Sequence, residues 1–236
     1  MNCYPEMDRN LEEVRARIKA AEERSGRSGT TLIAAVKYTD AEHIAYLAKL
    51  GVYNIGENRV QQLLEHWEAL RSFDLRYHFI GTLQTNKVKY IIDKVCMIHS
   101  VDSLSLAAEI EKQAAKRDRT MDILVEINSG REESKSGVLP EEAANFCGEI
   151  VKFPHLCLKG FMTMAPKCEK TEEYRKFFQE TYQQGLDIWT KKLHNIDRPI
   201  FSMGMSESFE PAIEEGATHI RVGRTLFRTG QSPEHS

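Results

Sequence analysis

Short runs of aliphatic and β-branched residues alternate along most of the chain with longer segments of helical spacing. Eight such runs occur, and each of the first seven is followed by an amphipathic segment; they are TLIAAVKY (31–38), YNIGE (53–57), YHFIG (77–81), CMIHSVD (96–102), MDILVEINSG (121–130), LCLKGFMTMAP (156–166), PIFSMGMS (199–206) and HIRVGRTLF (219–227). Strands that alternate with helices are typical of βαβ units and a parallel sheet. The pattern therefore predicts an α/β fold with eight strands.

The spacing of the units favours a closed barrel over an open, doubly wound sheet. Residues 30–227 hold eight βα units in 198 residues, about 25 residues per unit, which is close to the unit length of a compact (β/α)8 barrel. No GxGxxG follows the first run, so the usual fingerprint of a dinucleotide-binding sheet is missing. We predict one TIM-barrel domain over residues 1–236, with the barrel itself at about 30–227.

An additional helix is predicted before the first strand, at about residues 8–26. Leu11, Val14, Ile18 and Ala21 recur at helical spacing, and Gly26 stands where a helix would end. Only about nine residues follow the eighth run, too few for a covering helix of average length. We expect the N-terminal helix to occupy the place of the eighth helix of the barrel.

Composition narrows the class of protein. The 32 Lys and Arg face 35 Asp and Glu, giving a formal charge of -3, so the basic field that holds nucleic acid is absent. No apolar run approaches the roughly 18 residues that span a bilayer, and the acidic start is unlike a secretory signal. Five cysteines without a CxxC pair indicate reduced thiols in a cytoplasmic protein, and the dispersed histidines predict no metal site.

Lys37 is the first candidate for chemistry, because it directly follows the aliphatic stretch LIAAV. Alternation along a strand places Ile33, Ala35 and Lys37 on one face. If that face points inward, Lys37 enters the mouth of the barrel, where desolvation lowers the pKa of an amine and prepares it to form a Schiff base. The alternative is a lysine that snorkels to solvent at a strand end.

Closure of a barrel brings the eighth strand beside the first. Gly223 then allows close approach of a ligand, and the amides of Gly223, Arg224 and Thr225 can donate to phosphate oxygens. Ser206 adds a hydroxyl from the loop after strand seven, and Arg221 shares the face of Gly223 and points into the mouth. In the alternative interpretation Ser206 caps a helix and Arg221 forms an internal ion pair.

Motifs along nearly the whole chain resemble the pyridoxal phosphate homeostasis protein family: AVK (35–37), IGEN (55–58), HFIGTLQTNK (78–87), SVD (100–102), GFMTMAP (160–166), SMGMS (202–206) and IRVG (220–223). The family is similar to the N-terminal barrel of alanine racemases and ornithine decarboxylases. The resemblance implies pyridoxal 5'-phosphate (PLP) bound as an aldimine on Lys37. It also implies that Arg221 faces the pyridine nitrogen and that the remaining site residues line the cofactor or hold its phosphate: Asn58, Met205, Ser206, Gly223, Arg224 and Thr225.

Three positions depart from the family pattern. Arg59 stands where an aromatic residue usually follows GEN, and Ser208 stands where an acid often follows SMGMS. Arg224 replaces a small hydroxyl residue after IRVG, so the backbone part of the phosphate site is retained and the side-chain part differs. An arginine there adds a charge-assisted contact of its own.

The other motif residues receive mostly structural predictions. We expect His78, at the start of strand three, to form hydrogen bonds in the core. Gln84, Asn86 and Lys87 follow the upper end of that strand and are expected to border the ligand mouth. Four methionines of the motifs are expected to fill the core, although the resemblance assigns one of them to the cofactor: Met162, Met164, Met203 and Met205.

These observations predict a cytoplasmic protein that carries PLP on a lysine and acts in intracellular PLP homeostasis, without robust catalytic activity. PLP-dependent apo-enzymes are the expected recipients. The alternative is a PLP-dependent amino-acid racemase or decarboxylase, disfavoured because such enzymes complete the site with a second domain and a partner subunit. A Schiff-base aldolase without a cofactor is disfavoured because it has no need of a phosphate cradle.

Overall fold

The structure, a computed structural model, describes residues 4–37, 39–191 and 198–228. Eight parallel strands form a closed barrel in which each strand pairs with its neighbours in sequence and β1 pairs with β8. The strands are β1 (Thr31–Ala35), β2 (Asn54–Glu57), β3 (Arg76–Phe79), β4 (Met97–Val101), β5 (Met121–Ile127), β6 (Leu156–Thr163), β7 (Ile200–Ser202) and β8 (His219–Val222). The predicted TIM barrel is confirmed.

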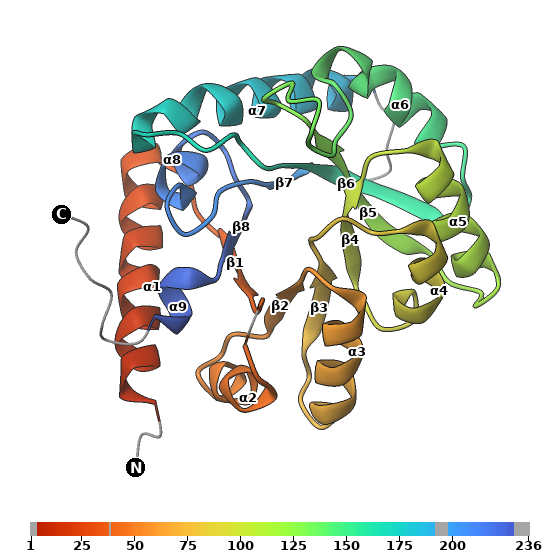
Figure 1. Cartoon of the computed structure of the whole chain (residues 1–236). Helices are drawn as coiled ribbons and strands as arrows, with labels where there is room; N and C mark the ends of the chain where they lie inside the picture. The colour runs from red at the N-terminus through yellow and green to blue at the C-terminus, as the bar shows by residue number, and fades with distance from the viewer. Residues whose placement is uncertain (1–3, 38, 192–197, 229–236) are drawn as a thin grey trace.

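Helices surround the barrel on its outside (Figure 1). The α-helices are α1 (Pro5–Ser25), α2 (Ala41–Lys49), α3 (Val60–Ala69), α4 (Val88–Ile91), α5 (Leu104–Ala115), α6 (Ala143–Ile150), α7 (Arg175–Thr190), α8 (Phe209–Glu214) and α9 (Arg224–Phe227). Three short 3-10 helices precede α4, α6 and α7: η1 (Thr85–Lys87), η2 (Pro140–Glu142) and η3 (Thr171–Tyr174). The helical pattern that precedes the seventh strand extends in the sequence to Leu193, and its last two residues lie outside the described residues.

Helix α1 fills the gap in the ring between α8 and α2 (Figure 1). Arg17 and Arg24 form ion pairs with Glu210 and Glu214 of α8, both at 2.7 Å. On the other side, the hydroxyl of Tyr46 in α2 donates to Asp8 in α1 at 2.9 Å. The N-terminal helix therefore takes the position that a full helix after β8 would have, as its pattern predicted.

The alternation of each strand divides the buried residues between two cores. Outward residues such as Ala34, Val36 and Ile220 belong to a large cluster with the apolar faces of the helices. Inward residues form a much smaller apolar cluster, of Met97, Leu124 and Met162. Much of the barrel interior is therefore polar, although apolar layers usually fill such barrels.

The strands are shorter than their sequence patterns suggested. Strand β7 covers only residues 200–202, so most of the SMGMS motif forms a loop at the barrel mouth. Met162 and Met203 are buried as expected, but Met164 and Met205 are at least a third exposed, so the prediction that they fill the core is wrong. Both lie beyond strand ends, where a methionine no longer faces a packed layer.

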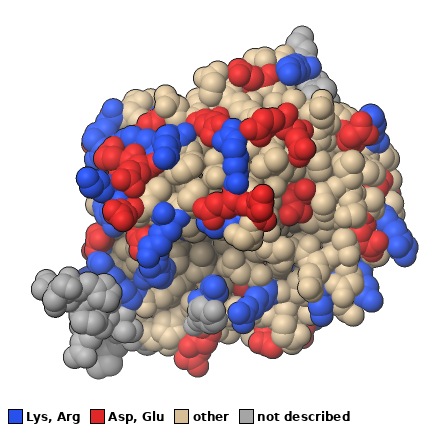
Figure 2. Space-filling view, turned by 45° about the horizontal axis from the view of Figure 1, so that its top comes forward, with Lys and Arg blue, Asp and Glu red and all other residues tan. Residues whose placement is uncertain are grey.

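The face of the molecule in Figure 2 shows no single basic field. On the face in Figure 2, Lys and Arg are interspersed with Asp and Glu. This distribution agrees with the formal charge of -3. Among the described residues, no helix is long and apolar enough to cross a bilayer.

Candidate cofactor site at the barrel mouth

The β1–β8 edge brings the predicted lysine and the predicted anion cradle together. Ala34 pairs with Val222, and Gly223 packs against Ala35, so Lys37 and the start of α9 both follow the upper ends of neighbouring strands. Lys37 is exposed, so the burial that the sequence argument assumed is not found in this structure. The lysine stands at the open end of the barrel, accessible to a ligand.

The loop after β7 meets the start of α9 through the Ser206 hydroxyl. Its Oγ accepts the N–H of Gly223 at 3.3 Å and that of Thr225 at 3.4 Å. Both bonds are long for N–H···O contacts, and both amides converge on one hydroxyl at the β1–β8 edge. Ser206 does not cap α8, because the N-cap residue of that helix is Ser208.

Position 223 requires glycine, because a residue with a side chain does not fit against the neighbouring strand. A Cβ at this position would lie 2.7 Å from the carbonyl oxygen of Ala35 on the neighbouring strand. Any larger residue would push β8 away from β1, because that oxygen is backbone and cannot turn aside. The close approach of the two strands therefore depends on this glycine.

Two of the residues that depart from the family pattern, Arg224 and Ser208, form specific side-chain contacts. Arg224 pairs with Glu207 at 2.8 Å, and both side chains are exposed. Ser208 is buried, and its Oγ accepts the amide of Met205 at 3.2 Å, which fixes the turn of the SMGMS loop. Met205 itself is 38% exposed at the edge of this loop.

Arg221 lies inside the barrel, paired in register with Ile33, and is only 3% exposed. Its Nη1 donates to the carbonyl oxygen of Ser202 at 2.6 Å and to the Ser202 hydroxyl at 2.7 Å, and its Nη2 donates to the carbonyl of Thr163 at 2.9 Å. Burial lowers the pKa of this guanidinium to about 10, and Glu126 opposes the shift. Arg221 thus remains a cation at neutral pH.

Sequence reasoning missed a buried carboxyl near Arg221. Glu126 on β5 is 3% exposed, and burial raises its pKa to about 7, with a further rise from Asp102 and an opposing effect of Arg221. The signal was present in MDILVEI, where alternation puts Asp122, Leu124 and Glu126 on one face. Alternation therefore indicates a carboxyl on the inward face of this strand, by the same argument that was applied to Lys37.

Asn58 borders a groove that the HFIGTLQTNK motif helps to build. A Cβ on Gly81 would lie 2.4 Å from the backbone oxygen of Asn58, so only glycine lets the loops after β2 and β3 touch. A cavity of about 590 Å³ opens there, lined by Asn58, Arg59, Gln84, Lys87 and Tyr90 among others. Gln84 and Lys87 thus share a cavity with Asn58, and whether they border the ligand stays a prediction. His78 is buried, with hydrogen bonds to Asn54 and His99, as expected.

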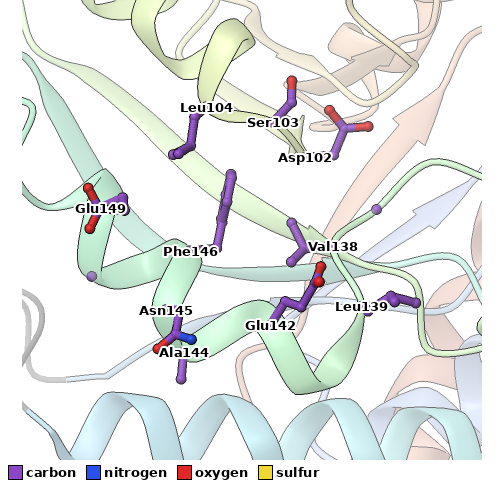
Figure 3. Close-up of a pocket in the computed structure, with 12 residues that line it drawn as sticks. Asp102, Ser103, Leu104, Val138, Leu139, Glu142, Ala144, Asn145, Phe146 and Glu149 are labelled. Carbon is purple, nitrogen blue, oxygen red and sulfur yellow. The ribbon is translucent and has the colours of Figure 1, made fainter.

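A second cavity, of about 730 Å³, lies between the start of α5 and α6 (Figure 3). Its charged lining residues are all acids, namely Asp102, Glu142 and Glu149. A phosphate ester would be repelled by these carboxylates, because like charges at short range disfavour one another. The backbone amides that converge on Ser206 lie instead at the β1–β8 edge.

The chain is similar in sequence to known proteins. The model of the alanine racemase N-terminal domain family matches residues 9–231. The chain is 42% identical over 229 residues to the pyridoxal phosphate homeostasis protein of Aquifex aeolicus (strain VF5), which covers 96% of this chain and 98% of that protein.

Solved structures share the barrel. PipY of Synechococcus elongatus PCC7942, solved with PLP bound, superposes with a TM-score of 0.83 at 26% identity, covering 94% of this chain and all of that one. Alanine racemase of Clostridium difficile 630 has a TM-score of 0.77 at 19% identity, and the match covers 98% of this chain and 58% of that enzyme. At this identity the racemase supports the fold alone.

Proposed function

The chain belongs to the family of pyridoxal phosphate homeostasis proteins, and we propose that it binds PLP at the barrel mouth and acts in intracellular homeostasis of this cofactor. The observation that carries the proposal is the placement of Lys37 at the same edge of the barrel as the amides that converge on Ser206, with the buried cation Arg221 below them. These groups complement an aldehyde, a phosphate and a ring nitrogen, respectively.

The residues present fit the cofactor. Three N–H bonds of Arg221 are directed at the barrel wall, and a guanidinium has five, so two remain for a ligand. Arg221 is buried, and the carboxyl that acts on it electrostatically is Glu126. Because burial raises the pKa of Glu126 to about 7, this carboxyl compensates the cation only in part at neutral pH. A ring nitrogen with a free lone pair is a suitable acceptor for it.

Each group has its own role in binding. The backbone N–H groups of Gly223 and Thr225, which donate to Ser206 Oγ in this structure, would turn to the phosphate, and Ser206 would add its hydroxyl. Arg224, held by Glu207 at the rim, contributes positive charge. Lys37 supplies the amine for the covalent link, while Asn58 and Met205 border the ligand. When bound, PLP supplies an aldehyde that bonds reversibly to amines.

Carriage of the cofactor, rather than turnover, is the role we propose. The Aquifex relative matches over 98% of its own length and is named a homeostasis protein. Arg221 also favours an unprotonated ring nitrogen, which is a weak electron sink for carbanion chemistry. We place the protein in the cytoplasm, with PLP-dependent apo-enzymes as recipients. A racemase or decarboxylase is the alternative.

Absorption spectroscopy during titration with PLP tests the proposal. The wild-type protein is expected to develop a visible band that survives dialysis, whereas Lys37→Ala does not. A wild-type protein that stays colourless would overturn PLP binding. Steady-state assays with common amino acids test the carrier role, because a rate of about 1 per second, at the low edge of ordinary enzymes, would favour the alternative.

A further inference from the structure

A line of buried polar side chains crosses the barrel interior beneath Arg221. The Ser202 hydroxyl lies 3.0 Å from His99 Nδ1, and His99 Nε2 lies 3.0 Å from His78 Nδ1. His78 Nε2 in turn lies 3.2 Å from Asn54 Oδ1. Side chains from β2, β3, β4, β7 and β8 thus connect the mouth to the opposite end of the barrel, where Asn54 and His78 line a cavity of about 370 Å³.

The donor and acceptor of each hydrogen bond along this line are fixed, because the guanidinium at its upper end can only donate. Arg221 donates to Ser202 Oγ, so the hydroxyl proton of this fully buried serine needs an acceptor, which His99 Nδ1 provides. A neutral His99 then carries its proton on Nε2 and donates to His78 Nδ1. His78 must therefore donate from Nε2, and it meets the carbonyl oxygen of Asn54, which accepts.

Both histidines remain neutral at physiological pH. Burial lowers the pKa of His78 to about 3, with smaller contributions from His219 and Arg76. Burial also holds the pKa of His99 well below its usual range, and His78, Arg221 and His219 act in the same direction. The direction of the hydrogen bonds is therefore not reversed by protonation in that range.

The hydrogen bonds to Ser202 and Thr163 determine which N–H groups of Arg221 remain available to a ligand. Both Nη1 hydrogens point at Ser202, and one Nη2 hydrogen points at Thr163. The Nε hydrogen and the second Nη2 hydrogen remain. If Ser202 lost its acceptor at His99, its hydroxyl would turn to another partner, and the guanidinium would lose one of the contacts that fix its plane.

We propose that Ser202 and His99 are positioning residues that act through Arg221, and that together they make the site selective for a ring that carries an acceptor nitrogen. The proposal rests on the proposed function, since it takes PLP as the ligand. It extends the recognition of the cofactor to side chains that do not touch it.

The experiment compares two ligands on each variant: PLP and 1-deazapyridoxal 5'-phosphate, in which a C–H replaces the ring nitrogen. One hydrogen bond from a charged donor contributes about 1.5 to 3 kcal/mol, so the wild-type protein is expected to bind PLP at least about tenfold more tightly than the analogue. Ser202→Ala and His99→Leu are expected to reduce that ratio to about threefold or less. His99→Asn, which keeps an acceptor near the Nδ1 position, is expected to retain it.

The ratio of the two affinities distinguishes a positioning role from a general loss of structure, because a packing defect weakens the binding of both ligands equally. A ratio that stays at the wild-type value in Ser202→Ala and His99→Leu would overturn the proposal, and so would a wild-type ratio near one. If His99→Leu does not fold, Ser202→Ala and His99→Asn still decide the matter. Failure of the wild-type protein to bind PLP at all would instead overturn the proposed function.

Discussion

Replacement of Glu126 by Gln tests the electrostatics of the barrel mouth. The pKa of this carboxyl rises from an ordinary value of 4.5 to about 7, mainly through burial. A raised pKa means that the folded protein holds the proton more tightly than the unfolded chain does. The stability that this proton confers is therefore present at low pH and is lost as pH rises through about 7.

The size of the effect follows from the two pKa values. Between about pH 5.5 and pH 8.5, linkage predicts that Glu126 removes about 2 kcal/mol from the free energy of unfolding. Glutamine has no proton to lose. The stability of Glu126→Gln relative to the wild-type protein should therefore rise by about 2 kcal/mol over this interval.

Urea denaturation of the cofactor-free proteins at several pH values measures this difference. Other titrating groups contribute equally to both proteins and cancel. Glu133→Gln, which also replaces a glutamate but at an exposed position, is the matched control. A Glu126→Gln difference that varies by less than about 0.5 kcal/mol across the pH range would show that burial does not raise the pKa of Glu126 to this extent.

Three further changes test other contacts. His66→Ala should lower the free energy of unfolding in urea by about 3 to 5 kcal/mol, because it leaves the buried carboxyl of Glu57 without its partner. His66 contacts this carboxyl at 2.6 Å. A loss below about 1 kcal/mol would contradict a stabilising role of the pair. Gly223→Ala should weaken PLP binding at least about tenfold in a fluorescence titration, since its Cβ meets the Ala35 carbonyl, and wild-type affinity would exclude a tight β1–β8 cradle. Pyridoxal without phosphate should bind at least about tenfold more weakly than PLP to the wild-type protein, whereas equal affinities would rule out phosphate anchoring.

Much of the barrel could be predicted from the sequence because its signals are local. Runs such as LIAAV and DILVEI have the length and β-branched content of buried strands, and eight of them at even spacing leave few alternatives to closure. Closure then places Lys37, Ser206 and Gly223 at one edge, since it makes the first and last strands neighbours.

The rest depends on tertiary contacts that no local pattern encodes. His99 and Ser202 are 103 residues apart in sequence, and their hydrogen bond exists only because β4 and β7 face each other across the barrel. The exposure of Lys37 and Met205 likewise depends on where β1 and β7 end, and strand ends are poorly marked by residue type. Arg224 begins α9, whereas its side-chain partner, Glu207, lies in the loop before α8.

Peptide mapping after borohydride reduction tests the central claim, that Lys37 carries the cofactor. The protein is loaded with PLP, reduced, digested and examined by mass spectrometry. We expect one dominant pyridoxyl adduct, on the peptide that contains Lys37, and its loss in Lys37→Ala. An adduct confined to another lysine, with Lys37→Ala still binding PLP as the wild-type protein does, would show that Lys37 does not carry the cofactor.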